Sequence, residues 1–144
     1  MNILQIAILI FVVIESLNVL TLYFNAGSRI GNGLGVFNAY DLAEKDEMVG
    51  PFVRYLIDWV AGAKLIFVMV GIAILFSTEP LVHLLVVIAF IISILSFYYR
   101  LFPMIKRLDE KGQITPKGYS KTLNYMIIGF LTMFVAALVI YLVF

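Results

Sequence analysis

The chain has 144 residues, of which 63% are hydrophobic and only 13% are charged, and its formal net charge at pH 7 is +1. A small water-soluble domain carries roughly 25% charged residues and a disordered chain has less apolar mass, so both classes are excluded. The low net charge offers no basic surface to nucleic acid. Because the chain has no cysteine, disulfides, iron–sulfur clusters and thiolate metal sites are also excluded. The composition predicts an integral membrane protein.

Four apolar runs are each about as long as the ~20 residues needed to cross a hydrocarbon core of ~30 Å. Because lipid offers no partner to free backbone amides, such runs form helices. The sequence therefore predicts an all-α fold, a polytopic four-transmembrane-helix bundle that forms a single membrane domain over residues 1–144. The first run contains Glu15 and Asn18 and has no basic segment before it, so we expect a retained helix rather than a secretory signal. The predicted spans are residues 3–24, 52–76, 80–102 and 122–144.

The connections between the spans differ in length. Only residues 77–79 separate the second span from Pro80, which predicts a tight hairpin whose proline begins the third helix. Residues 25–35 hold four glycines, which is typical of an adaptable loop. Residues 36–48 show an amphipathic pattern that predicts a short interfacial helix on the bilayer surface.

The Lys and Arg residues predict the orientation. All ten except Lys64 lie in or beside the two long connections, and loops rich in these residues stay on the cytoplasmic side. We therefore expect both long loops to be cytoplasmic and both termini outside, in a plasma or inner cell membrane. Lys106, Arg107 and Lys111 are candidates for binding anionic lipid headgroups. The alternative is that these residues act only as the topology signal.

Four ionisable residues fall within the spans: Glu15, Asp58, Lys64 and Arg100. A charge at bilayer depth costs at least about 2.5–3.5 kcal/mol, so each needs a partner or water. At 1.5 Å per residue, Glu15 lies at a depth between those of Asp58 and Lys64. We therefore predict that Glu15 pairs with Lys64 and that Asp58 reaches Arg100, which makes a self-neutralised cluster in the cytoplasmic half.

Small and polar residues recur along one face of each span, and such residues allow close approach between membrane helices. These faces are predicted to point inward, and the cluster is predicted to open into a water-accessible vestibule on the loop side, near Asn18, Asn124, Tyr125, Tyr98 and Tyr99. His83 is interpreted as an interfacial residue. The predicted inward faces hold Glu15 and Asn18; Ala61, Lys64 and Gly71; Ala89, Ser93, Ser96 and Arg100; and Tyr125, Gly129, Thr132 and Ala136.

The chain has no paired histidines and no HExxH or GxSxG motif, so we expect no enzyme activity, no cofactor and no metal site. One hypothesis is a proton- or ion-linked channel or small-solute carrier. We expect such a channel or carrier to form a homo-oligomer, because four helices barely enclose a pathway. The other hypothesis is a non-catalytic accessory or scaffold subunit that binds a partner membrane protein or anionic lipid, its charges only fixing helix register. The candidate binding or transport residues are Glu15, Asn18, Asp58, Lys64, Arg100, Asn124 and Tyr125.

Overall fold

A computed structural model describes all 144 residues and shows an all-helical protein. It has no strands, only one isolated β-bridge between Phe37 and Ile114. Four of its helical segments are long and apolar enough to cross a membrane, the third being α4 and α5 together. The helices are α1 (Ile3–Phe24), α2 (Asn38–Glu44), α3 (Val49–Leu75), α4 (Pro80–Leu95), α5 (Phe97–Glu110) and α6 (Tyr119–Val143).

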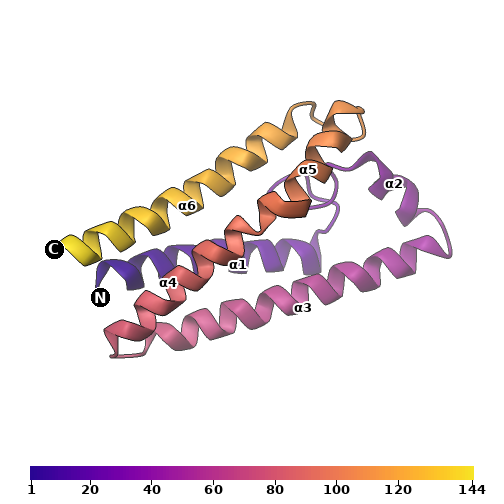
Figure 1. Ribbon diagram of the computed structural model, residues 1–144. Helices are drawn as coiled ribbons and strands as arrows, with labels where there is room; N and C mark the ends of the chain where they lie inside the picture. The colour runs from indigo at the N-terminus through magenta and orange to yellow at the C-terminus, as the bar shows by residue number, and fades with distance from the viewer.

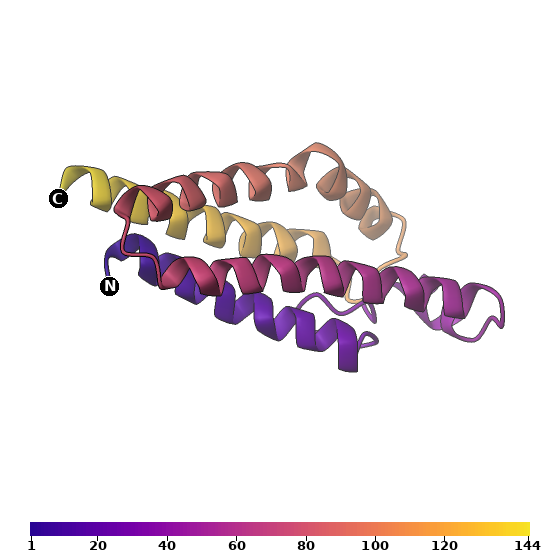
Figure 2. The same cartoon turned by 90° about the horizontal axis from the view of Figure 1, so that it is seen from below.

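The long helices lie side by side, with both termini and the turn between α3 and α4 at one end (Figure 1). We call this the terminal end. The two long connections lie at the opposite end, which we call the loop end; the view in Figure 2 shows the same arrangement. Helix α1 contacts α3, α4 and α6. It therefore supplies the central surface on which the other long helices pack.

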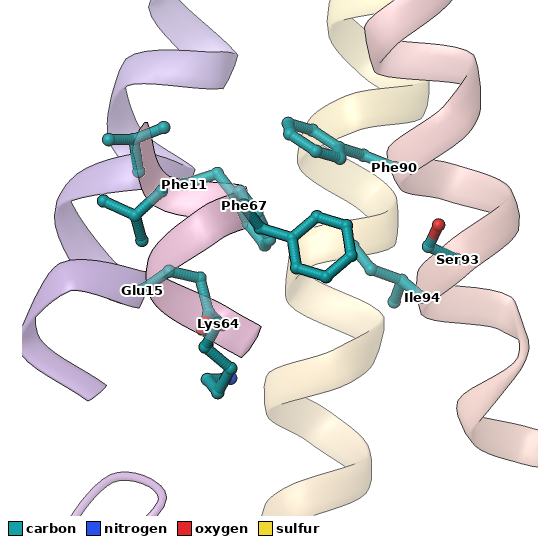
Figure 3. A pocket seen from close by; sticks show the side chains of 9 residues that line it. Phe11, Glu15, Lys64, Phe67, Phe90, Ser93 and Ile94 are labelled. Atoms are coloured by element: carbon teal, nitrogen blue, oxygen red, sulfur yellow. The ribbon is translucent and has the colours of Figure 1, made fainter. Parts of the chain in front are cut away.

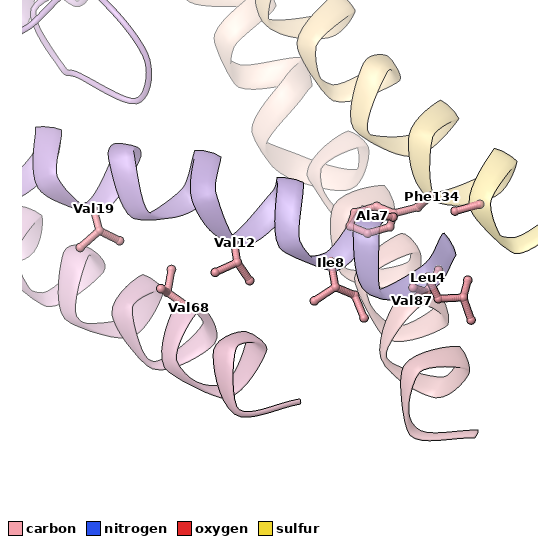
Figure 4. Packing of buried hydrophobic residues seen from close by; sticks show 9 residues of the cluster. Leu4, Ala7, Ile8, Val12, Val19, Val68, Val87 and Phe134 are labelled. Carbon is pink, nitrogen blue, oxygen red and sulfur yellow. The ribbon is translucent and has the colours of Figure 1, made fainter. Parts of the chain in front are cut away.

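The largest buried cluster is apolar and lies along α1 (Figure 4). Phe11 lies at its aromatic centre, with its ring centroid 4.8 Å from that of Phe90 on α4 and 5.4 Å from that of Phe134 on α6. Such separations are typical of favourable aromatic pairs. Gly71 lets α3 approach α1 closely, because a Cβ at that position would lie 2.5 Å from Val12 Cγ2.

Helix α3 begins at Val49, three residues before the predicted span. The Asp46 carboxylate accepts hydrogen bonds of 2.9 Å from the backbone N–H groups of Met48 and Val49. Pro51 lies in the first turn, where its missing N–H leaves no helical hydrogen bond unmade. A side-chain cap outside the apolar run thus extends the helix.

The third helical segment continues beyond the predicted boundary at Phe102 and is interrupted at Ser96, between α4 and α5. Pro103 lies inside α5, where it cannot donate to the carbonyl one turn earlier. Beyond it, Ile105 and Asp109 are buried, whereas Lys106 is exposed. Helix α5 is therefore amphipathic in its last two turns.

The two long connections pack against each other instead of extending separately. The Asn38 N–H donates to Gln113 O at 3.0 Å, and the Thr115 N–H donates to Val36 O at 2.8 Å. Beneath these bonds, Val36 and Ile114 are buried together with Ile105. Helix α2 occupies the middle of the predicted segment 36–48 and has no buried residue.

Helix α6 is capped by a side chain from α5. The Asp109 carboxylate is buried and accepts hydrogen bonds of 2.9 Å from the N–H groups of Gly118 and Ser120, and one of 2.5 Å from the Ser120 hydroxyl. A carboxylate is stabilised at a helix N-terminus by the free amides and the helix dipole. This cap begins α6 at Tyr119, three residues before the predicted span.

The predicted inward faces are correct for two helices and wrong for two. On α3, Ala61 and Gly71 are buried as expected. On α4 and α6 the small and polar residues are exposed, including Ala89, Thr132 and Ala136. The aromatic side chains of Phe90 and Phe134 occupy the interior instead, since bulky rings fill the space around Phe11.

His83 is buried, contrary to the interfacial position that we expected. Its Nε2 lies 3.2 Å from Ile74 O, and its Nδ1 lies 3.5 Å from Asn2 Nδ2. Gln5 donates to the neighbouring carbonyl of Leu75 at 3.2 Å. Ile74 O also accepts from the Ser77 N–H at 3.0 Å, so the His83 ring is a further polar neighbour of the last turn of α3, and this polar contact is a structural reason for a buried histidine.

Candidate functional site

The Glu15–Lys64 pair joins the two helices with the most extensive contact, α1 and α3. Lys64 Nζ lies 2.6 Å from Glu15 Oε2, and the two side chains are 25% and 16% exposed. Counted at 1.5 Å per residue, each residue lies about 17–18 Å from the terminal end of its helix. This depth is near the middle of a hydrocarbon core of ~30 Å. The two groups that we expected to meet are therefore in contact.

Asn18 lies one turn from Glu15 toward the loop end and is buried. Its Nδ2 donates to Glu15 Oε1 across 3.5 Å. The glycine-rich loop covers Asn18, because a Cβ at Gly31 would lie only 2.9 Å from Asn18 Oδ1. The carboxylate therefore has a charged partner on one oxygen and an amide on the other.

The glycine-rich loop, residues 25–35, is compact. The Leu34 N–H donates to Ala26 O at 2.6 Å, and the Gly35 N–H donates to Ser28 O at 3.1 Å. A Cβ at Gly35 would overlap Gly27 O, so no larger residue fits without moving the backbone. The loop is irregular, as predicted, and its glycines permit a tight fold that closes over the loop end of α1.

A cavity of about 260 Å³ lies next to the Glu15–Lys64 pair, between α1, α3 and α4 (Figure 3). We call it the side cavity. Both Phe11 and Phe67 lie toward the terminal end from the charged pair, so the cavity extends that way. This is the opposite direction from the predicted vestibule. The side cavity is lined by Phe11, Val12, Glu15, Lys64, Phe67, Val68, Phe90, Ser93 and Ile94.

The side cavity is mainly apolar and reaches the outer surface between α3 and α4. Val68 at its inner wall is 4% exposed, whereas Phe67 is 62% exposed. Ser93, on the α4 wall, is also exposed. The two helices are joined by the short turn at the terminal end and diverge from it toward the loop end (Figures 1 and 2).

Asp58 and Arg100 do not form the second half of the predicted cluster. Asp58 Oδ1 lies 2.9 Å from Arg54 Nη2, one turn earlier on α3, and the Arg54 and Asp58 side chains are 45% and 44% exposed. Arg54 also donates to Tyr23 O at 2.7 Å. Arg100 is exposed, with its guanidinium 5.6 Å from the Tyr99 ring centroid. The prediction of a four-charge network is wrong, because Asp58 has a nearer cation on its own helix.

The remaining candidates lie away from the side cavity. Asn124 Oδ1 accepts a hydrogen bond of 3.0 Å from the Tyr98 hydroxyl, which joins α5 to α6. Tyr125 is 72% exposed. The candidate headgroup residues Lys106, Arg107 and Lys111 are exposed at the end of α5, beyond Pro103.

Sequence reasoning missed most of the cavity wall. Phe11, Phe67 and Phe90 carry no signal that separates them from other apolar residues of a span, so only packing identifies them. Ser93 belongs to the stripe that the sequence predicts to face inward, but it is exposed and lies at the edge of the cavity. The structure contains no group of three or more His, Cys, Asp or Glu residues that could hold a metal ion.

Comparisons with protein-family models, curated proteins and solved structures found no match. The class of protein therefore follows from the four apolar helices alone: their length and composition are those of a membrane protein.

Proposed function

We propose that this chain is a small carrier, a four-helix transmembrane bundle in which the Glu15–Lys64 pair takes up and releases a proton or cation as a small solute binds in the side cavity. The observation that carries this proposal is a charged pair at mid-span depth that borders a cavity instead of being enclosed by packing. Charges at such depth commonly mark pathways for ions or protons. The Glu15 carboxylate and the Lys64 ammonium both border the space in which the solute would bind, so the solute and the ion would share one site.

We further propose that the loop end faces the cytoplasm and that both termini lie outside, in a plasma or inner membrane. The support is the distribution of Lys and Arg, which flank the loop end and are absent from the turn between α3 and α4. In this orientation α2 lies at the cytoplasmic membrane surface. Its lack of any buried residue agrees with such a position.

Proton flux into liposomes tests the carrier. The full chain is reconstituted in liposomes that enclose a pH-sensitive dye, and a potassium gradient with valinomycin drives protons inward. Wild type should acidify the interior faster than protein-free liposomes do, and Glu15→Gln should lower that rate at least tenfold. Asp58→Asn is the matched control, because this carboxylate pairs with Arg54 outside the cavity. Wild-type flux at the protein-free rate refutes the carrier.

A second candidate is an accessory subunit that packs α6 against another membrane helix. It is favoured by Gly129, Thr132 and Ala136, which form an exposed small-residue face on α6. A shallow groove along this face includes Thr132 and Ala136. Small residues of this kind allow close contact between helices in lipid. The exposed cations Lys106, Arg107 and Lys111 would then hold anionic lipid beside the complex.

Cysteine cross-linking tests this second candidate for the case of a second copy. The chain has no cysteine of its own, so Thr132→Cys introduces a single thiol. Mild oxidation in membranes should give a covalent dimer for Thr132→Cys and none for Met69→Cys, which is exposed on α3. Equal dimer yields from both variants would show random collision and refute a specific α6 contact.

A further inference from the structure

The mouth of the side cavity opens toward lipid, which determines how a ligand arrives. Phe67 and Ser93 at the mouth are exposed on the long apolar helices α3 and α4. When these helices span a membrane, that surface faces hydrocarbon near the middle of the bilayer. A molecule that reaches the cavity by this route has first dissolved in the bilayer, so it is lipophilic.

The charges at the cavity wall favour an uncharged ligand. Glu15 and Lys64 neutralise each other across 2.6 Å. A charged ligand would add an ion without a counter-ion at a depth where isolated charges cost several kcal/mol. The ligand that leaves this balance intact carries no formal charge.

The polar groups of the wall offer hydrogen-bond donors. Lys64 has three N–H groups, of which Glu15 takes one, and no other protein group accepts a hydrogen bond from the ammonium. The Ser93 hydroxyl on the opposite wall has no hydrogen-bond partner in the protein either, although its backbone carbonyl accepts from Ser96. Two donors in an apolar cavity match a ligand with an acceptor oxygen.

The size and lining of the cavity point to a ring. A volume of about 260 Å³ exceeds the ~150 Å³ of a protein cavity that holds one benzene molecule, so it has room for a molecule with one or two rings. Phe11, Phe67 and Phe90 present aromatic surface to this space (Figure 3). Aromatic side chains pack favourably against flat rings in offset or edge-on contact.

We propose that the side cavity binds an uncharged lipophilic ring compound with a carbonyl oxygen, which enters from the bilayer between α3 and α4 and accepts a hydrogen bond from Lys64 Nζ. This assignment rests on the proposed carrier function to the extent that both use the same site. It names the class of solute.

Photolabelling with 4-butylbenzophenone tests the assignment, because this probe is uncharged, has two rings and a carbonyl, and inserts into nearby C–H bonds on irradiation. The full chain in lipid nanodiscs is labelled and digested, and the modified residues are found by mass spectrometry. We expect saturable labelling concentrated at Phe11, Phe90 and Ile94. Excess 4-butylacetophenone, a ring ketone, should compete at least tenfold better than butylbenzene, which lacks the acceptor oxygen.

Three variants locate the site. Ser93→Phe fills the mouth of the cavity and should lower labelling at least tenfold. Ile92→Phe is the control and should leave labelling unchanged, because Ile92 is 64% exposed and lies outside the cavity lining. Glu15→Met/Lys64→Met keeps the site uncharged and removes the Lys64 donor without adding another N–H group, so the apparent affinity should fall about tenfold, as expected for a lost hydrogen bond to a charged group.

The labelling and flux experiments together distinguish ligand binding from transport. Unsaturable labelling along all lipid-facing helices shows partitioning only and overturns the assignment. Equal competition by butylbenzene shows that the cavity accepts a hydrocarbon chain, and unchanged affinity in the double variant shows that Lys64 does not bind the oxygen; each result overturns it. Specific labelling without proton flux supports the binding site and refutes the carrier. Proton flux without specific labelling supports the carrier and refutes the binding site.

Discussion

Lys64 Nζ lies 2.6 Å from Glu15 Oε2, and this contact joins the central helix α1 to α3. The pair meets because the chain reverses direction between the two helices, which brings residues 49 positions apart in sequence to one depth. It also lies at the wall of the side cavity, so a molecule bound there would touch both charged groups. Structure and proposed chemistry therefore depend on the same contact.

Breaking the pair from one side should destabilise the fold more than removing both charges. We expect Glu15→Gln or Lys64→Met alone to lower the free energy of unfolding by about 1–3 kcal/mol, because each leaves one charge without a partner. The double variant should recover at least half of that loss. Unfolding by SDS in mixed micelles measures all four proteins, and simple additivity of the two single effects would contradict the coupling.

The cap on α6 should contribute measurably to stability. Asp109→Asn replaces a carboxylate that accepts from Ser120 and from backbone amides, so we expect a loss of about 1–2 kcal/mol. Glu110→Gln is the neighbouring control, because its 3.9 Å contact with Lys106 is exposed and should be worth less than about 0.5 kcal/mol. Equal losses in thermal unfolding would mean that the cap is unimportant.

The glycine-rich loop should tolerate no side chain at Gly35. A Cβ there would overlap Gly27 O, whereas Gly112 has a positive φ of 68° but open space around it. We expect Gly112→Ala to cost about 1 kcal/mol through backbone strain alone and Gly35→Ala to cost more. Limited proteolysis in micelles should cut residues 25–35 faster in Gly35→Ala than in Gly112→Ala. Identical cleavage rates would show that this loop is less compact than the structure indicates.

The Asp46 cap should respond to acid. Hydrogen bonds from the backbone N–H groups of Val49 and Met48 hold the pKa of the Asp46 carboxyl below its ordinary value of 3.8. Because the folded pKa is the lower one, the cap stabilises the start of α3 above the ordinary pKa and is lost as pH falls through the folded value. Carboxyl NMR titration in micelles should give a midpoint below 3.8. A midpoint at or above that value contradicts the cap.

Hydropathy predicts the four spans well because a membrane requires long, continuous apolar helices. The boundaries shift where polar caps act from outside the apolar runs. The Asp46 cap extends α3 to Val49. The cap on α6 is Asp109, which lies eleven positions before Ser120 in the sequence and accepts a hydrogen bond from its N–H. Neither cap produces a hydropathy signal, and the Asp109 contact also requires the packing of α5 against α6.

The candidate site was partly predictable for a similar reason. The depth of a residue in the membrane follows from its position along the helix alone, at 1.5 Å per residue. This was enough to predict that Glu15 pairs with Lys64. Rotation about each helix axis was harder to predict, because lipid supplies no hydrophobic force to turn a small or polar face inward. The structure instead turns Phe90 and Phe134 inward against Phe11. That arrangement exposes Thr132 and leaves Ser93 at the mouth of a cavity.

The hydrogen bonds between the two long connections have a mechanical consequence for α4. The turn at residues 76–79 joins α3 to α4 at the terminal end, and the bonds from Val36 and Asn38 hold the connection before α3 against the connection after α5. Because both ends are restrained in this way, α3 and α4 can move apart only if a helix bends along its length. The third helical segment is interrupted at Ser96, three residues from Ser93, so we expect any bending that widens the mouth of the side cavity to occur there.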